Sequence, residues 1–184
     1  EEIFLNELNR IPTDNEYKLL KEEFVQQLKI EKDRDPSQFL EVNGAKDFIK
    51  LLNEMDHPLG IATGGWEASA RLKLDAVDIG VKDLGFSNSS RYKTRHGIIN
   101  DVMNQLTAGD KIDPNEIIYF GDGMWDMITC RKMGIHFIGI DYDGDQILKG
   151  AGVIPVFKDF SNKDAIMDII NNGGIGIGKI NLDF

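Results

Sequence analysis

Two aspartates, Asp122 and Asp126, stand four positions apart, directly after an apolar run at residues 117–120. The run is short enough for a strand buried on both faces, and the glycines on either side of Asp122 allow the chain to turn sharply. Asp122 then ends a strand, where open parallel sheets bind their ligands, and Asp126 follows one helical turn later. Two carboxylates at this spacing can share a hard cation such as Mg²⁺. A plain turn with an acidic helix cap fits the same residues equally well.

A hydroxyl followed by two glycines, at Thr63, Gly64 and Gly65, ends a second apolar run at residues 59–63. A hydroxyl at a strand end, next to free backbone N–H groups where a helix starts, is suited to cradling a phosphate. By itself a Thr-Gly-Gly sequence is more often only a turn, so its meaning depends on what lies beside it.

Basic residues, including Lys93 and Arg95, precede a helix predicted around Ile98. A cation at a helix N-terminus opposes the helix dipole, and pairing with a phosphate or with carboxylates would be a functional reason for it. For any one of these residues a solvated loop is the simpler interpretation. Together, the cradle, a cation and the carboxylate pair are the parts that a Mg²⁺-dependent phosphoryl-transfer site needs, and the nucleophile is still missing.

The elements that must position these groups change in character along the chain. Residues 1–40 predict helices with one apolar side each, whereas residues 41–174 alternate short apolar runs with helical patterns. Such alternation indicates a parallel sheet with right-handed crossovers, so we expect an α/β fold with a Rossmann-like three-layer core. Residues 175–184 form a separate tail with strand character. The predicted strands are residues 59–63, 84–86, 117–120, 136–140 and 152–156.

The composition excludes several classes of partner. With a net charge of -10, the chain is a poor match for nucleic acid or an anionic membrane, and a phosphorylated substrate would need local positive charge and a metal. The single cysteine, Cys130, cannot form an intrachain disulfide and fits a reducing compartment. No apolar run approaches the length of a membrane span. We therefore expect a cytoplasmic protein; its oligomeric state is not readable from the sequence.

The order of these motifs resembles the haloacid dehalogenase superfamily, and its phosphoglycolate-phosphatase-like members in particular, across about residues 42–170. The resemblance implies that Thr63 and the amide of Gly64 hold phosphoryl oxygens, with Gly65 also in the substrate-binding turn. It implies that Asp122 and Asp126 hold Mg²⁺. Arg95 is the best match for the cation of the third motif, with Lys93 as the alternative, because lysine is the commoner choice in the family. Residues 1–40 resemble the later part of the family's helical cap.

The family's first motif is an apolar strand that ends in Asp-x-Asp and supplies the nucleophile and the general acid. It is expected ahead of the cap, and residues 1–40 do not contain it. Residues 179–184 resemble the first half of that motif and stop just before its second aspartate. Our hypothesis is that this tail supplies the central strand of the core, with Asp183 as the nucleophile. An unrelated edge strand fits the tail equally well.

The resemblance implies a Mg²⁺-dependent phosphatase that hydrolyses a small phosphomonoester, a phosphorylated metabolite, through a phospho-aspartate intermediate. A dehalogenase is less favoured, because the aspartate pair suits a metal that dehalogenation does not use. Two alternatives stay open: a phosphomutase of the same family, and a non-catalytic relative or partner-binding domain.

Overall fold

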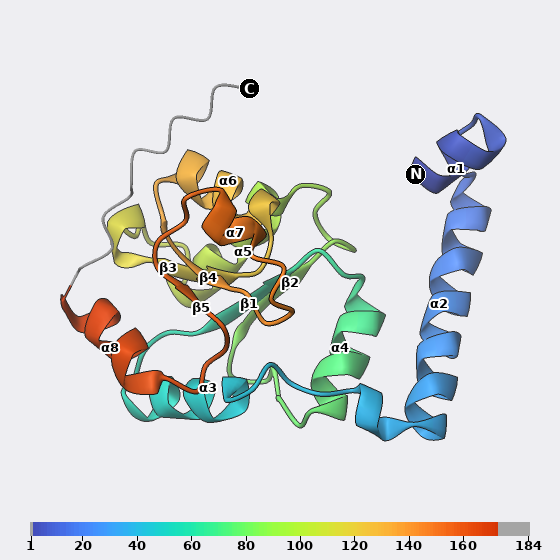
Figure 1. The fold of residues 1–184 in the computed structure, drawn as a ribbon. Coiled ribbons are helices and arrows are strands. Elements are labelled where there is room, and N and C mark those ends of the chain that lie inside the picture. The colour runs from blue at the N-terminus through green and yellow to red at the C-terminus, as the bar shows by residue number, and fades with distance from the viewer. Residues whose placement is uncertain (1, 173–184) are drawn as a thin grey trace.

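Strands and helices alternate from residue 45 onward in the computed structural model, which describes residues 2–172 (Figure 1). The predicted Rossmann-like α/β class is confirmed. Two single-turn 3₁₀ helices, Pro36–Gln38 and Pro114–Glu116, lie in the connections. The strands and helices in chain order are α3 Ala45–Glu54, β1 Gly60–Thr63, α4 Glu67–Ala76, β2 Gly85–Asn88, α5 Arg95–Leu106, β3 Ile118–Gly121, α6 Met124–Met133, β4 His136–Ile140, α7 Ile147–Gly150, β5 Val156–Phe157 and α8 Lys163–Asn172.

Every strand pairing in the described chain is parallel, as the alternating pattern predicts. β1 pairs with β2, with Gly60 opposite Gly85. β3 pairs with β4, and β4 with β5. Within residues 2–172 the strands therefore form two separate groups, β1-β2 and β3-β4-β5, and no pairing joins β1 to β3.

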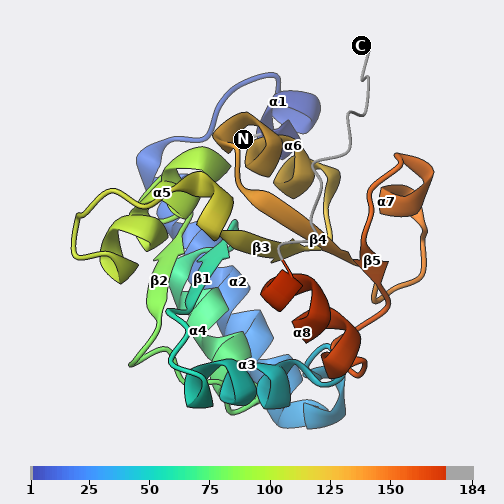
Figure 2. The same ribbon diagram turned by 90° about the vertical axis from the view of Figure 1, so that its left-hand side faces the viewer.

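Two apolar clusters, one on each face, hold the helices against the strands (Figure 2). On one face Phe48 of α3 and Ile166 of α8 pack with Phe120 of β3. On the other face α5 and α6 cover the strands, and Cys130 of α6 is fully buried among apolar neighbours. This layering aligns the carboxyl ends of the strands along one edge of the molecule.

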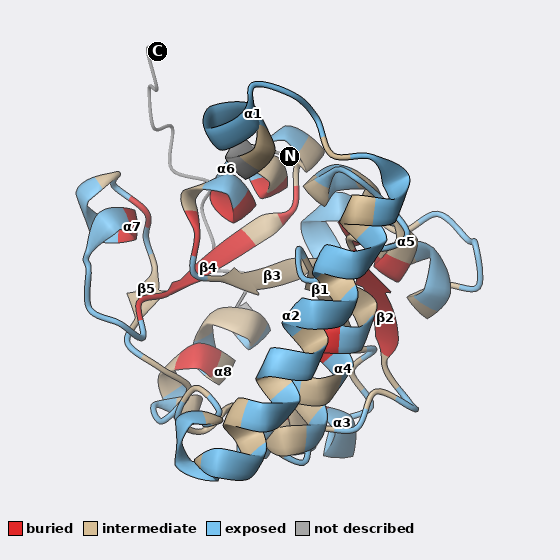
Figure 3. Ribbon diagram, turned by 90° about the vertical axis from the view of Figure 1, so that its right-hand side faces the viewer, coloured by how far each residue is buried: buried red, intermediate tan, exposed pale blue. Residues whose placement is uncertain are grey.

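Burial along the strands differs from the sequence expectation in one respect. We expected the strand before Asp122 to be buried on both faces, but all four residues of β3 are only half-buried. β2 is buried throughout, as is most of β4 (Figure 3). The reason is that, within residues 2–172, β3 has a strand partner on one edge only, and its other edge borders an open cleft.

Two strand predictions need adjusted boundaries. The strand expected at residues 84–86 extends to Asn88. The strand expected at residues 152–156 begins only at Val156, after a cis Ile154-Pro155 bond. Proline has no backbone N–H to donate to a neighbouring strand. Pro155 therefore contributes only its carbonyl, which accepts from the N–H of Gly139 in β4 at 3.0 Å, and the strand itself begins at the next residue.

The N-terminal residues form two helices, α1 Glu2–Leu8 and α2 Asp14–Arg34. A capping box starts α2: the Thr13 hydroxyl accepts from the backbone N–H of Glu16, whose side chain accepts from the Thr13 N–H. α2 lies along α4 (Figure 1) and has no buried residue of its own. None of the helices described in residues 2–172 is long and apolar enough to cross a bilayer.

Candidate active site

A cleft of about 280 Å³ opens at the carboxyl ends of β1 and β3. It gathers residues that lie far apart in the sequence and that the motif analysis singled out separately. The rest of its wall is largely apolar or aromatic, including Phe120, Tyr142 and Phe160. The predicted site residues that line it are Thr63, Gly64, Arg95, Asp122 and Asp126.

The turn after β1 has the form of an anion cradle. The Thr63 hydroxyl oxygen accepts a hydrogen bond from the backbone N–H of Gly65 at 3.0 Å, which leaves its own proton available for donation. A Cβ added at Gly64 would lie 3.3 Å from Nη2 of Arg95, tighter than most real contacts. Glycine at this position thus lets the guanidinium come close to the backbone of the turn.

Arg95 is the first residue of α5, and Thr94 caps that helix by accepting from the N–H of Gly97 at 3.1 Å. The Arg95 Nε donates to Oδ1 of Asp126 at 2.9 Å. The arginine side chain is 20% exposed and the aspartate side chain 5% exposed, so the ion pair is largely shielded from water. The carboxylate offsets the unfavourable position of a cation at a helix N-terminus.

Tyr119 belongs to this site, and the motif analysis missed it. Its hydroxyl lies 3.3 Å from Oδ1 of Asp126 and 3.3 Å from the carbonyl oxygen of Ala62. Burial and the nearby Asp126 carboxylate raise the pKa of Tyr119, so the phenol stays protonated and donates. The sequence signal was a phenol within an otherwise apolar strand, because a buried hydroxyl must find an acceptor.

The ionised form of the Asp126 carboxylate is disfavoured by its buried surroundings. Burial raises its pKa, the Arg95 guanidinium opposes that rise, and the charge of Asp122 adds to it. Two carboxylates that line one cleft, Asp126 buried and Asp122 exposed, are only partly balanced by one guanidinium, and they form an oxygen donor set that suits a hard divalent cation. The residues present therefore fit the metal that the sequence suggested.

Among the described residues, two of the predicted site residues do not line the cleft. Lys93 is exposed on the loop before α5, and the cation that reaches the cleft is Arg95. Gly65 contributes its N–H to the Thr63 hydroxyl and does not itself line the cavity. Asp183 lies outside the described residues, so its role stays a prediction.

A second acidic group lies after β4, and the motif analysis did not single it out. Asp141, Asp143 and Asp145 can bring carboxylate oxygens within 4.8 Å of one another. Each of them accepts a backbone N–H within its own loop, for example Asp145 from Ile147 at 2.9 Å. These hydrogen bonds explain why aspartate occurs at every second position here: each side chain stabilises the turn of its own loop.

These features place the chain in the class of Rossmann-like α/β proteins that gather polar groups at the carboxyl ends of parallel strands. A model of the haloacid dehalogenase-like hydrolase family matches residues 4–140, and the chain belongs to this family.

Solved structures share the fold. A hydrolase from Pseudomonas syringae is 20% identical, with a TM-score of 0.70 over 92% of this chain and 77% of that one. A HAD hydrolase of family IA, variant 3, from Entamoeba histolytica is 14% identical, with a TM-score of 0.69 over 94% of this chain and 77% of that one. At these identities the likeness shows the fold alone. Among curated proteins no match is found.

Proposed function

We propose that this hydrolase is a Mg²⁺-dependent phosphatase that acts on a small phosphomonoester. The observation that carries the proposal is the convergence of a hydroxyl, a guanidinium and two carboxylates on one cleft of about 280 Å³. The chain has a net charge of -10, so a phosphate is attracted only where positive charge is concentrated locally. The cleft offers such a place beside Arg95.

The phosphoryl group would be held by the turn after β1. The Thr63 hydroxyl proton and the backbone N–H of Gly64 are donors for two of its oxygens. The Arg95 Nε is engaged with Asp126, and the Nη2 end of the guanidinium faces the Gly64 backbone. The arginine can therefore bind Asp126 and a phosphoryl oxygen at the same time.

Asp122 and Asp126 would hold the Mg²⁺ ion, which supplies charge neutralisation for the phosphoryl oxygens. Arg95 shares that task and also fixes the orientation of the Asp126 carboxylate. Tyr119 donates to the same carboxylate, so two donors keep Asp126 in place before substrate arrives.

The reaction is a double displacement. An aspartate carboxylate attacks phosphorus and the alcohol departs, and water then hydrolyses the acyl phosphate to release inorganic phosphate. Asp183 is the candidate nucleophile from the sequence, and it lies outside the described residues. The groups of the cleft bind the phosphoryl oxygens and stabilise the charge that develops on them.

The test is release of p-nitrophenol from p-nitrophenyl phosphate by the full chain, with and without Mg²⁺. We expect activity only with the metal, and we expect Asp122→Asn to abolish it while the circular dichroism spectrum is unchanged. Mg²⁺ should also raise the melting temperature of the wild-type protein, because it binds the folded state and relieves the repulsion between two carboxylates.

Asp143→Asn is the matched control, since it removes a carboxylate from the exposed acidic loop and leaves the cleft intact. We expect it to retain both the activity and the Mg²⁺-induced rise in melting temperature. Metal-dependent activity that survives in Asp122→Asn would refute the assignment of the site. An inactive wild-type protein would refute the proposed function.

A further inference from the structure

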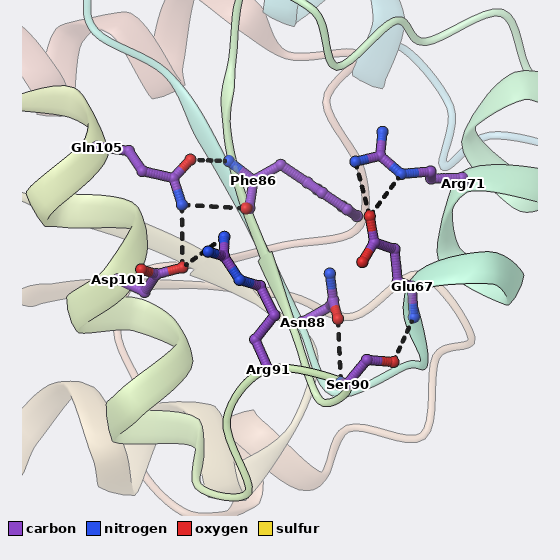
Figure 4. Close-up of polar contacts among 8 residues, drawn as sticks. All are labelled: Glu67, Arg71, Phe86, Asn88, Ser90, Arg91, Asp101 and Gln105. Carbon is purple, nitrogen blue, oxygen red and sulfur yellow. Dashed lines mark hydrogen bonds and ion pairs between the residues drawn. The ribbon is translucent and has the colours of Figure 1, made fainter. Parts of the chain in front are cut away.

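The loop between β2 and α5, residues 89–94, is bound at its beginning to the turn after β1. The backbone N–H of Ser89 donates to the carbonyl oxygen of Gly65 at 3.1 Å. The Ser90 hydroxyl accepts from the N–H of Glu67, the first residue of α4, at 3.1 Å (Figure 4). The loop thus holds the segment that we propose binds the phosphoryl group.

Asn88, the last residue of β2, shapes the first part of this loop. Its side-chain oxygen accepts from the N–H of Ser90 at 3.0 Å. Its carbonyl oxygen accepts from the N–H groups of Arg91 and Tyr92, at 3.1 and 3.3 Å. Such bonds from an asparagine to the residues that follow it define a turn. Because Asn88 is buried, the start of the loop is anchored to the core.

The later part of the loop is bound to α5 through one carboxylate, that of Asp101. The Tyr92 hydroxyl donates to Oδ1 of Asp101 at 3.1 Å. Nη1 of Arg91 donates to Oδ2 at 3.4 Å (Figure 4). The Asp101 side chain is only 14% exposed, although the residue lies on a helix away from the cleft. Aspartate is a poor helix former, so its place in the middle of α5 is explained by partners of this kind.

The same carboxylate is also held from the side of β2. Gln105, one turn further along α5, donates to Oδ2 of Asp101 at 3.0 Å. The Gln105 side chain accepts from the N–H of Phe86 at 2.9 Å and donates to its carbonyl at 3.1 Å, in the manner of a neighbouring strand (Figure 4). Asp101 thus accepts from three side chains, and its position is set by β2 as well as by the loop.

Gly97 allows the loop to fold back along α5. A Cβ added at Gly97 would lie 3.2 Å from Cβ and from Cδ1 of Tyr92, tighter than most real contacts. The Tyr92 side chain therefore lies against the first turn of the helix on its way to Asp101. The N–H of Gly97 is bound to the Thr94 hydroxyl, which caps this turn. The first turn of α5, which begins with Arg95, is thus held by the loop that precedes it.

Arg95 depends on where this first turn lies, because its guanidinium meets two different elements. Its Nε is 2.9 Å from Oδ1 of Asp126 on α6. Its Nη2 lies against the backbone of Gly64 in the turn after β1. A shift of the helix start by about 1 Å would take the bond to Asp126 beyond hydrogen-bonding distance.

We propose that Asp101 is a positioning residue for Arg95. It holds residues 91–92 against α5, while residues 89–90 hold the turn after β1, and the loop thereby sets the spacing between that turn and the Arg95 guanidinium. Asp101 does not line the cleft, so it acts through the loop and Arg95. Its effect on phosphate binding rests on the proposed function, whereas its effect on Arg95 rests on these contacts.

The first test is the Nε–H signal of Arg95 in a proton–nitrogen correlation spectrum, assigned by its loss in Arg95→Lys. The bond to the buried Asp126 carboxylate slows exchange of this proton with water. In Asp101→Ala it should exchange at least about tenfold faster than in the wild type. Asn100→Ala, an exposed neighbour on α5, is the control and should leave the rate unchanged. Equal rates in the wild type and in Asp101→Ala would overturn the proposal.

Tyr92→Phe takes the place of Asp101→Ala if that variant does not fold, because it removes only the hydroxyl that donates to Asp101. The Arg95 proton should again exchange faster, by at least about threefold, since a hydrogen bond to a charged group is lost. A rate equal to that of the wild type would then count against the proposal in the same way.

Steady-state kinetics with p-nitrophenyl phosphate separates positioning from a mere loss of folded protein. A smaller folded fraction lowers kcat and leaves KM unchanged. A misplaced Arg95 weakens binding of the phosphoryl oxygens, so KM and the inhibition constant of inorganic phosphate should both rise about tenfold in Asp101→Ala. Both should stay at the wild-type values in Asn100→Ala. A lower kcat with unchanged KM would show that Asp101 only stabilises the fold, and would overturn its positioning role.

The two readouts distinguish this proposal from the proposed function. If the wild type releases no phosphate, the proposed function fails, while the exchange of the Arg95 proton still decides whether Asp101 positions Arg95. If phosphate is released and that proton exchanges equally in the wild type and in Asp101→Ala, the positioning proposal fails alone.

Discussion

Arg95 and Asp126 form an ion pair inside the cleft, with Nε 2.9 Å from Oδ1 and the aspartate almost fully buried. The pair joins the first turn of α5 to the first turn of α6, two helices that cover the same face of the strands. It thereby links the turn after β1, which we propose binds phosphate, and the carboxylate pair into one cleft.

Arg95→Ala should destabilise the protein by about 3 kcal/mol, because it leaves the buried Asp126 carboxylate without its cation. Urea unfolding measures this cost. Lys93→Ala, two positions away on the exposed loop, is the control and should change the free energy of unfolding by less than about 0.5 kcal/mol. The double variant Arg95→Ala with Asp126→Asn should lose less than the sum of the two single changes. Equal costs for Arg95→Ala and Lys93→Ala would contradict the pairing.

Gln105→Ala should destabilise the protein by about 1–2 kcal/mol, because both backbone groups of Phe86 lose their partner. The exposed edge of β2 should also promote self-association, which size-exclusion chromatography over a range of concentrations detects. Asn104→Ala, an exposed neighbour on α5, is the control. The interpretation fails if both variants behave alike.

Trp66→Ala should loosen α2 from the core. The indole N–H donates to the Tyr17 hydroxyl at 3.0 Å, and the Tyr17 and Phe24 rings each lie 5.7 Å from the indole in edge-to-face geometry. Because α2 has no buried residue of its own, these contacts matter to its docking. Amides of α2 should exchange faster in the variant, while those of β4 should not. Trp125→Ala, a tryptophan that is 62% exposed, should leave α2 unchanged.

Cys130 should resist thiol reagents in the folded protein at pH 8 and react readily once unfolded. Burial raises the pKa of its thiol to about 12, from an ordinary value of 9.0. The thiolate is the reactive form, so little of it exists in the folded state. Stability that depends on this protonated thiol is fully present below pH 9 and is lost as the pH rises toward 12.

Unfolding measured between pH 8 and pH 11 should therefore show a steeper loss of stability in the wild type than in Cys130→Ala, which has no thiol to titrate. Identical slopes, or rapid labelling of the folded protein, would show that the thiol is accessible to solvent.

The sequence located Thr63 and Asp122 because each follows a short apolar run and is bordered by glycine. A strand that ends in a tight turn is decided by residues within a few positions of one another. The order of strands and helices could likewise be predicted from local patterns of apolar residues. The alternation of strands with helices was then enough to predict that the strands pair in parallel. The helix predicted around Ile98 is present, although it already begins at Arg95, a residue that the sequence analysis placed ahead of it.

The choice between Arg95 and Lys93, the part played by Tyr119 and the half-burial of β3 were decided only by the tertiary structure. Each depends on segments that are distant in sequence: α5 against α6, β3 against β1. Local propensity sets where a helix or strand begins, but the partner of a side chain is set by how whole elements pack. The sequence by itself therefore determined the class of fold and the motifs of the cleft, and packing decided which cation meets Asp126 and which residues share the cleft with it.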